Sequence, residues 1–152
     1  MSYCVAIKVN EGLVFASDSR TNAGLDNVNT YSKMFTYNVG DRAFVILTAG
    51  NLATSQAVYH QLEKDLNSPN PEINLNLCED LEAVAAYIGQ LSIASFNQSL
   101  EVQSQSSLMG SNFILGGQIK NQDPNILMIY PEGNYIYACL LYTSPSPRDT
   151  IR

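Results

Sequence analysis

The sequence predicts an α+β fold in which sheets pack on one another and helices lie outside them. Apolar segments with strand-like patterning come first and last, and two segments with helical periodicity lie between them. Each of these helices carries one apolar stripe, which must be buried against another surface, and the strands offer it. The strands around Leu115, Ile129 and Ile136 carry apolar residues on both faces, which indicates that both faces are covered. With 152 residues, 45% of them hydrophobic, the chain can form one domain with a sizeable core.

Two hairpins are predicted before the helices. Each consists of two apolar runs that flank a short segment of turn residues. The predicted strands are 3–9 and 13–17 around Asn10-Glu11-Gly12, then 33–37 and 42–47 around Asn38-Val39-Gly40-Asp41. Residues 21–32 are polar and rich in Asn and Gly, so we expect a loop that returns Lys33 to the sheet.

The periodic segments predict helices over 50–66 and 80–97. In the first, Val58, Leu62 and Leu66 recur every four residues, with Ala53 and Ala57 beside them. His60 falls off this stripe and is expected to face water. A polar connection over 99–110 should follow the second helix, and strands over 112–119, 126–130 and 135–138 should complete the order.

Ser2 is the candidate nucleophile. Removal of Met1, which depends on a small second side chain, would leave Ser2 with a free α-amine, whose pKa of roughly 7.7–8.0 suits a general base. Lys33 would favour the neutral amine and the developing alkoxide, and Asp18 would hold Lys33 charged and oriented. Gly50, at the predicted start of a helix, could offer its amide to an oxyanion. We expect Lys33→Ala to cost activity and stability, and Asp18→Asn mainly activity.

Each of these residues also has an ordinary interpretation. Serine after the initiator Met is common, Asp18 could end a strand, Lys33 could be a solvated surface charge, and Gly50 could only turn strand into helix. The ordered set is more informative than any member. Cys4 is best interpreted as a small apolar residue on a strand.

Several longer segments resemble the proteasome β-type family of N-terminal-nucleophile hydrolases, and within it the bacterial group Anbu, the ancestral beta subunit. The segments that carry this resemblance lie between Ser2 and about Ala138. They are Tyr3–Ala6, Glu11–Gly24, Tyr31–Phe35, Leu47–Thr54, Phe113–Gln118 and Ile129–Asn134.

The resemblance implies a four-layer αββα sandwich and peptide-bond hydrolysis inside a self-compartmentalising oligomer. Ser2 then matches the nucleophile position, although the family usually has Thr there. Asp18 and Lys33 match the acidic and basic partners, and Gly50 the oxyanion amide. The substrate-binding positions implied are Thr21 and Ala49. The implied partners are peptide substrates and identical subunits in a ring or open helical oligomer.

The last fourteen residues read differently from the rest. Two closely spaced prolines, Pro145 and Pro147, interrupt them, and they do not resemble the family. We therefore expect a partial proteasome-type protease domain over residues 1–138 and an unrelated or non-native tail over 139–152. The sandwich would be incomplete, with its second helix layer missing, and the isolated chain should be inactive and poorly soluble.

Composition excludes several other functions. The net charge is −6, and the eight basic residues form no stripe, so nucleic-acid binding has no electrostatic basis. No apolar run approaches the roughly 20 residues of a membrane span. The three cysteines show no metal-ligand spacing, so we expect neither metal nor cofactor. Their odd number suits a reducing compartment, and we expect the protein in the cytoplasm.

Two other functions remain open from the sequence. The chain could be a catalytically silent, ring-forming structural subunit, or an amidohydrolase acting on small amides. The presence of Ser2, Asp18 and Lys33 argues against the silent subunit. The choice between peptides and small amides depends on assembly into a closed chamber.

Overall fold

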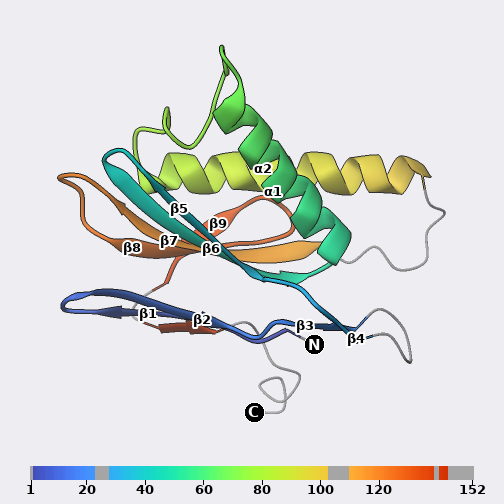
Figure 1. Cartoon of the computed structure of the whole chain (residues 1–152), viewed down its shortest axis with the longest axis horizontal. Helices are drawn as coiled ribbons and strands as arrows, with labels where there is room; N and C mark the ends of the chain where they lie inside the picture. Colours follow the sequence, from blue (N-terminus) through green and yellow to red (C-terminus); the bar gives the residue numbers. More distant parts are fainter. Residues whose placement is uncertain (1, 23–27, 103–109, 139–140, 144–152) are drawn as a thin grey trace.

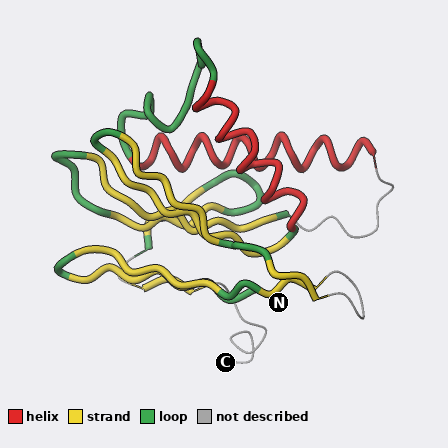
Figure 2. The backbone as a smooth tube through the Cα atoms, viewed as in Figure 1, coloured by secondary structure: helices red, strands yellow, loops and turns green. Residues whose placement is uncertain are grey.

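The structure is a computed structural model that describes residues 2–22, 28–102, 110–138 and 141–143. Its elements form three layers (Figure 1). Helices α1 and α2 cross each other on one side of a five-stranded sheet, and the sheet that contains β1 and β2 lies on the other side. Figure 2 shows the same layers by element type. In the part of the chain that the structure describes, no helix covers the outer face of the β1–β2 sheet.

Ten strands and two helices are present among the described residues. The helices are α1 (Leu52–Asn67) and α2 (Leu81–Val102). The strands before them are β1 (Cys4–Val9), β2 (Gly12–Ser17), β3 (Arg20–Asn22), β4 (Val28–Thr30), β5 (Met34–Val39) and β6 (Arg42–Gly50). The strands after them are β7 (Ser111–Ile119), β8 (Asn125–Ile129), β9 (Tyr135–Tyr137) and β10 (Leu141–Thr143).

All strand pairs among the described residues are antiparallel, and most join neighbours in the chain. The central sheet has the order β5-β6-β7-β8-β9, and the others are β10-β1-β2 and β3-β4. Both predicted hairpins are confirmed, because Val9 pairs with Gly12 and Val39 with Arg42. Two-residue connections of this kind fix the register of the strands they join.

The central sheet is buried on both faces along β6, β7 and β8, as predicted for Leu115 and Ile129, but Ile136 on the edge strand β9 is 46% exposed. Toward the helices the sheet presents a core that includes Phe44, Ile46, Phe113 and Leu115. Toward β1 the central sheet presents the buried residues Leu47, Ile114, Ile126 and Met128. They form a second core with Cys4 and Ala6 of β1. Tyr59 joins α1 to the first core by stacking on Phe35, with ring centroids 4.5 Å apart. The sequence-based prediction of an α+β fold with sheets packed on sheets is therefore confirmed.

Helix α1 begins two residues later than the sequence predicted, and α2 begins one residue later. Asn51 caps α1 by accepting bonds from the backbone N–H groups of Ala53 and Thr54, so the helix begins at Leu52 and not at residue 50. Asp80 accepts a bond from the N–H of Ala83 at the start of α2. The predicted position of His60 on the exposed side of α1 is confirmed.

Four further details differ from the sequence-based expectation. Ala53 and Ala57 are exposed and do not belong to the buried stripe of α1. Helix α2 continues to Val102, where a polar connection had been expected from residue 99. Residues 20–22 and 28–30 form a small hairpin instead of a plain loop, because β3 pairs with β4.

The fourth difference concerns the predicted tail. Strand β10 lies within residues 139–152 and pairs with β1, with Val5 opposite Thr143. No strand had been expected there. Cys139, Pro145 and Pro147 lie outside the described residues, and the boundary after residue 138 stays a prediction.

Candidate active site

The β1–β2 hairpin brings Asp18 to the start of β1. Cys4, the first residue of β1, pairs with Ser17, the last residue of β2. Because the two strands are antiparallel, Tyr3, which precedes Cys4, lies opposite Asp18, which follows Ser17. The N–H of Asp18 donates to the carbonyl of Tyr3 at 3.0 Å. In return, the N–H of Tyr3 donates to Oδ1 of Asp18, also at 3.0 Å. The half-buried Ser2 directly precedes this pair of bonds.

Lys33 completes the contact around Asp18. Its Nζ lies 2.9 Å from Oδ1 of Asp18, so the predicted ion pair is present. The same ammonium donates to the carbonyl of Arg20 at 2.5 Å. The Lys33 side chain is 5% exposed and that of Asp18 is 33% exposed. The cation is therefore the buried partner, and water reaches only the carboxylate.

Asp18 is held in its charged form by these neighbours. Its partial burial would raise the pKa of the carboxyl, but the Tyr3 N–H and the Lys33 ammonium outweigh burial and keep the pKa below its ordinary value. At neutral pH, Asp18 is thus a carboxylate that binds both a side chain and the backbone of the residue after Ser2.

Gly50 occupies a different place from the one predicted. It is the last residue of β6, opposite Ser111, and not the start of a helix. The N–H of Thr48 donates to the carbonyl of Lys33 at 3.0 Å. The backbone N–H groups of even-numbered residues in β6 therefore point toward β5. The N–H of Gly50 is directed to that same side, beyond Met34, where β5 begins. An amide at the end of a ladder, and not a helix terminus, is therefore the candidate oxyanion donor.

Only glycine fits at position 50. The residue has φ of +125°, and a Cβ would lie 2.7 Å from the carbonyl oxygen of Gly110. Both observations show that the backbone is tightly placed where β6 turns into the cap of α1.

The other two candidate site residues lie on different strands. Ala49 precedes Gly50 in β6, pairs with Asn112, and is half-buried against the core that contains Cys4. Thr21 is in β3 opposite Asn29, and its side chain lies outside the described part of the structure. The structure thus brings Asp18 and Lys33 together at Tyr3, the residue after Ser2, and places Ala49 beside Gly50.

Cys4 and Thr48 join this arrangement without having been assigned a role from the sequence. The thiol of Cys4 donates to the carbonyl of Thr48 at 3.4 Å, which links β1 to β6. Cys4 is buried, as predicted. Burial and, second, the nearby Asp18 carboxylate raise its pKa to about 11, against the opposing effect of Lys33, so the thiol stays protonated. Thr48 lies in Leu47–Thr54, one of the segments that carry the family resemblance. The residues that it contacts are distant in the sequence, so no local pattern indicated these contacts.

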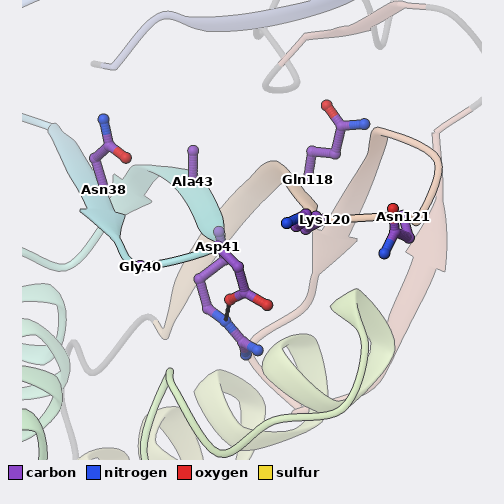
Figure 3. Close-up of a pocket in the computed structure, with 8 residues that line it drawn as sticks. Asn38, Gly40, Asp41, Ala43, Gln118, Lys120 and Asn121 are labelled. Atoms are coloured by element: carbon purple, nitrogen blue, oxygen red, sulfur yellow. Dashed lines mark hydrogen bonds and ion pairs between the residues drawn. The ribbon is translucent and has the colours of Figure 1, made fainter.

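A shallow pocket lies at the other end of the central sheet (Figure 3). Its residues come from the β5–β6 turn and from the end of β7, about 26 Å along β6 from Gly50 at about 3.3 Å per residue. Figure 3 shows Asn38, Ala43 and Gln118 pointing to one side and Asp41 to the other. Arg42 is held by Asp41 and by the carbonyls of the segment between the helices.

Comparison with known proteins identifies the fold and the family. The chain is similar to Anbu, the ancestral beta-subunit, from Yersinia bercovieri, with a TM-score of 0.85, 32% identity, and coverage of 99% of this chain and 66% of that one. It is similar to the helical assembly of the Anbu complex from Pseudomonas aeruginosa, with a TM-score of 0.86, 35% identity, and coverage of 94% and 60%. Anbu from Hyphomicrobium sp. strain MC1 gives a TM-score of 0.79, 36% identity, and coverage of 94% and 60%.

The chain thus spans 60–66% of the length of these three solved structures. No curated protein sequence matches it. Among the described residues, no helix is long and apolar enough to cross a membrane. The proteasome subunit family matches residues 2–140, which is most of the chain. Together with the identity to the Anbu structures, this match shows that the chain belongs to the proteasome subunit family.

Proposed function

We propose that this chain carries the catalytic site of a proteasome-type peptidase, in which the hydroxyl of Ser2 attacks the peptide carbonyl after Met1 is removed. The observation that supports it most directly is the buried Lys33 ammonium, 2.9 Å from an Asp18 carboxylate that also binds the N–H of Tyr3. A buried ion pair is costly to form, because both charges lose water. Because Asp18 binds Tyr3, the residue after the proposed nucleophile, we assign the ion pair a role in the reaction of Ser2.

The proposed reaction needs no histidine. The α-amine of Ser2 takes the proton from Oγ as that oxygen bonds to the substrate carbonyl carbon, and later passes it to the leaving amine. Water then attacks the acyl-enzyme and releases the acid. The Lys33 ammonium stabilises the developing negative charge on Oγ, and Asp18 keeps Lys33 charged and in place.

The oxyanion of the tetrahedral intermediate would be bound by the backbone N–H of Gly50. Such a donor is worth roughly 2.7–4 kcal/mol in acyl transfer. Thr21 and Ala49 would bind the backbone of an extended peptide from β3 and β6. Neither a metal nor a cofactor enters the proposed reaction.

Assembly and substrate length belong to the same proposal. The similar structure from Pseudomonas aeruginosa is a helical assembly of the Anbu complex, which supports identical subunits as partners of this chain in a ring or open helix. We propose a cytoplasmic location and substrates that are peptides rather than small amides. The expected inactivity of the isolated chain refers to turnover: because the chain spans only part of the matched structures, we expect Ser2 to be acylated by a reactive probe but no peptide to be turned over.

The test is labelling of the purified chain with a peptide epoxyketone or a β-lactone, followed by mass spectrometry of the N-terminal peptide. An epoxyketone bonds to both the hydroxyl and the α-amine, so an adduct requires removal of Met1. We expect one adduct on Ser2 in the wild type and none in Ser2→Ala, with an unchanged fold in that variant.

The controls separate the competing functions. Ser19→Ala removes an exposed hydroxyl next to Asp18 and should leave labelling unchanged. Absence of an adduct in a folded wild type would refute the nucleophile and favour the silent structural subunit. Turnover of small amides but not of peptides by an assembled particle would favour the amidohydrolase.

A further inference from the structure

Three buried hydroxyls form a chain directly behind Gly50. They belong to Thr48 on β6, Ser55 on α1 and Ser111 on β7, and each is almost fully buried. Thr48 Oγ1 lies 2.6 Å from Ser55 Oγ, and Ser55 Oγ lies 3.1 Å from Ser111 Oγ. Ser111 Oγ donates to the carbonyl of Asn51 at 2.7 Å. We call these three side chains the hydroxyl chain.

The hydroxyl chain has one direction. Ser111 uses its only proton on the Asn51 carbonyl, so its oxygen accepts from Ser55 Oγ, which also lies 3.0 Å from the Asn51 carbonyl oxygen. Because the one proton of Ser55 points toward Ser111 or Asn51, Thr48 donates to Ser55. Hydrogen bonds arranged in series polarise and strengthen one another in a buried site. The three hydroxyls therefore act together on the carbonyl of Asn51, the residue that follows Gly50.

The same residues hold the backbone on both sides of Gly50. On its C-terminal side, the Asn51 carbonyl accepts bonds from the Ser111 hydroxyl and from both the N–H and the hydroxyl of Ser55. On its N-terminal side, Thr48 donates its N–H to the Lys33 carbonyl and accepts the Cys4 thiol on its own carbonyl. Thr48 thus connects β1 at Cys4, the backbone of Lys33 and, through its hydroxyl and Ser55, the cap of α1.

An apolar core would be expected at the junction of a sheet and a helix, and buried hydroxyls are costly there unless they are satisfied. We propose that Thr48, Ser55 and Ser111 are positioning residues, whose hydroxyl chain fixes the Gly50 amide relative to Ser2 and Lys33. This inference rests on the proposed function, because it names what holds the oxyanion donor of that reaction. None of the three side chains is assigned contact with the substrate.

The test combines one spectroscopic and one chemical measurement on the same variants. Thr48→Val removes the hydroxyl and keeps the shape, Thr48→Ser restores the hydroxyl, and Ser111→Ala cuts the last link. Two-dimensional amide NMR of the 152-residue chain should show a shifted Gly50 resonance in Thr48→Val and Ser111→Ala. The resonance should return toward its wild-type position in Thr48→Ser, and the distant Gly40 should not move.

The chemical measurement is the acylation of Ser2 by a β-lactone over a range of probe concentrations. In Thr48→Val and Ser111→Ala we expect the rate at saturating probe to fall about tenfold to a hundredfold, since a misplacement of about 1 Å can cost ~10²-fold. The concentration giving half of that rate should stay the same, because the probe still binds. Thr48→Ser should recover most of the rate.

Two controls distinguish positioning from a loss of stability. Ser92→Ala removes another buried hydroxyl, on α2, for which the described structure gives no hydrogen-bond partner. Ile129→Val weakens the helix-side core. Neither should change the acylation rate or the Gly50 resonance. An equal loss of rate in either control, or failure of Thr48→Ser to recover it, would overturn the positioning role.

The outcomes also separate this inference from the proposed function. If the folded wild type is not acylated at all, the proposed nucleophile is wrong, and the NMR comparison decides the inference by itself. A Gly50 resonance that stays unchanged in both Thr48→Val and Ser111→Ala overturns it in every case.

Discussion

Replacement of Asp18 by asparagine is expected to cost more stability than replacement of Lys33 by methionine. The sequence alone favoured the opposite order. The difference comes from exposure, since the Lys33 side chain is 5% exposed and the Asp18 side chain 33%. Asp18→Asn leaves a buried ammonium without its counter-charge, whereas Lys33→Met leaves a carboxylate that water can reach.

The magnitudes follow from the same contacts. Removing one partner of a buried pair costs roughly 3–5 kcal/mol. Lys33 would keep the carbonyl of Arg20 as an acceptor, so we expect about 3 kcal/mol for Asp18→Asn. Asp18 would keep the N–H of Tyr3 and its water, so Lys33→Met should cost about 1 kcal/mol, near the value of an exposed pair. For a chain of this size, 1 kcal/mol corresponds to about 2–4 °C in melting temperature.

The assay is thermal unfolding of both variants at pH 7, followed by circular dichroism. Asp41→Asn is the matched control, because Asp41 forms an ion pair of 3.0 Å with Arg42 but its side chain is 51% exposed. Its melting temperature should equal that of the wild type. If Lys33→Met unfolds at a lower temperature than Asp18→Asn, the assignment of Lys33 as the buried partner is refuted.

Three further predictions concern neighbouring groups. Gly50→Ala should destabilise the chain by about 1–3 kcal/mol and abolish labelling of Ser2, because its φ and the Gly110 carbonyl exclude a Cβ; Gly40→Ala, with open space around it, should cost less, as denaturant titration would show. Because the pKa of Asp18 is lowered by folding, its stabilisation is present above pH ~4 and is lost as the pH falls through the folded pKa. The melting temperatures of wild type and Asp18→Asn should therefore converge in acid, and a constant gap would contradict this. Cys4, with a pKa of about 11, should resist iodoacetamide at pH 8 in the folded chain and react on unfolding.

Local signals in the sequence were sufficient for the hairpins and for the existence of both helices. Turn residues between apolar runs mark the connections at residues 10–11 and 40–41, and these depend only on neighbours. The start of α1 was misplaced because Gly50 was taken as its first residue, although Asn51 is a preferred cap residue. The short β3–β4 hairpin was missed because its strands have three residues each and no apolar alternation.

The site was only partly predictable, for a related reason. Asp18 and Lys33 were chosen for the chemistry they could give Ser2 and for a family resemblance, and their contact follows from a register that the first hairpin fixes. The hydroxyl chain joins residues 48, 55 and 111 from two strands and a helix. No spacing in the sequence indicates such a meeting, since it exists only once α1 lies on the sheet.

The bond from the N–H of Tyr3 to Asp18 has a consequence for how this site can vary. The Asp18 carboxylate holds the start of the chain through the backbone N–H of Tyr3, a group that every residue except proline possesses. Tyr3 comes one position after the proposed reactive side chain. The identity of residue 2 is therefore separated from its placement. A serine, a threonine or an inert alanine could occupy that position and be presented in the same place, so the reactive group can be exchanged in a single substitution while the machinery around it stays intact.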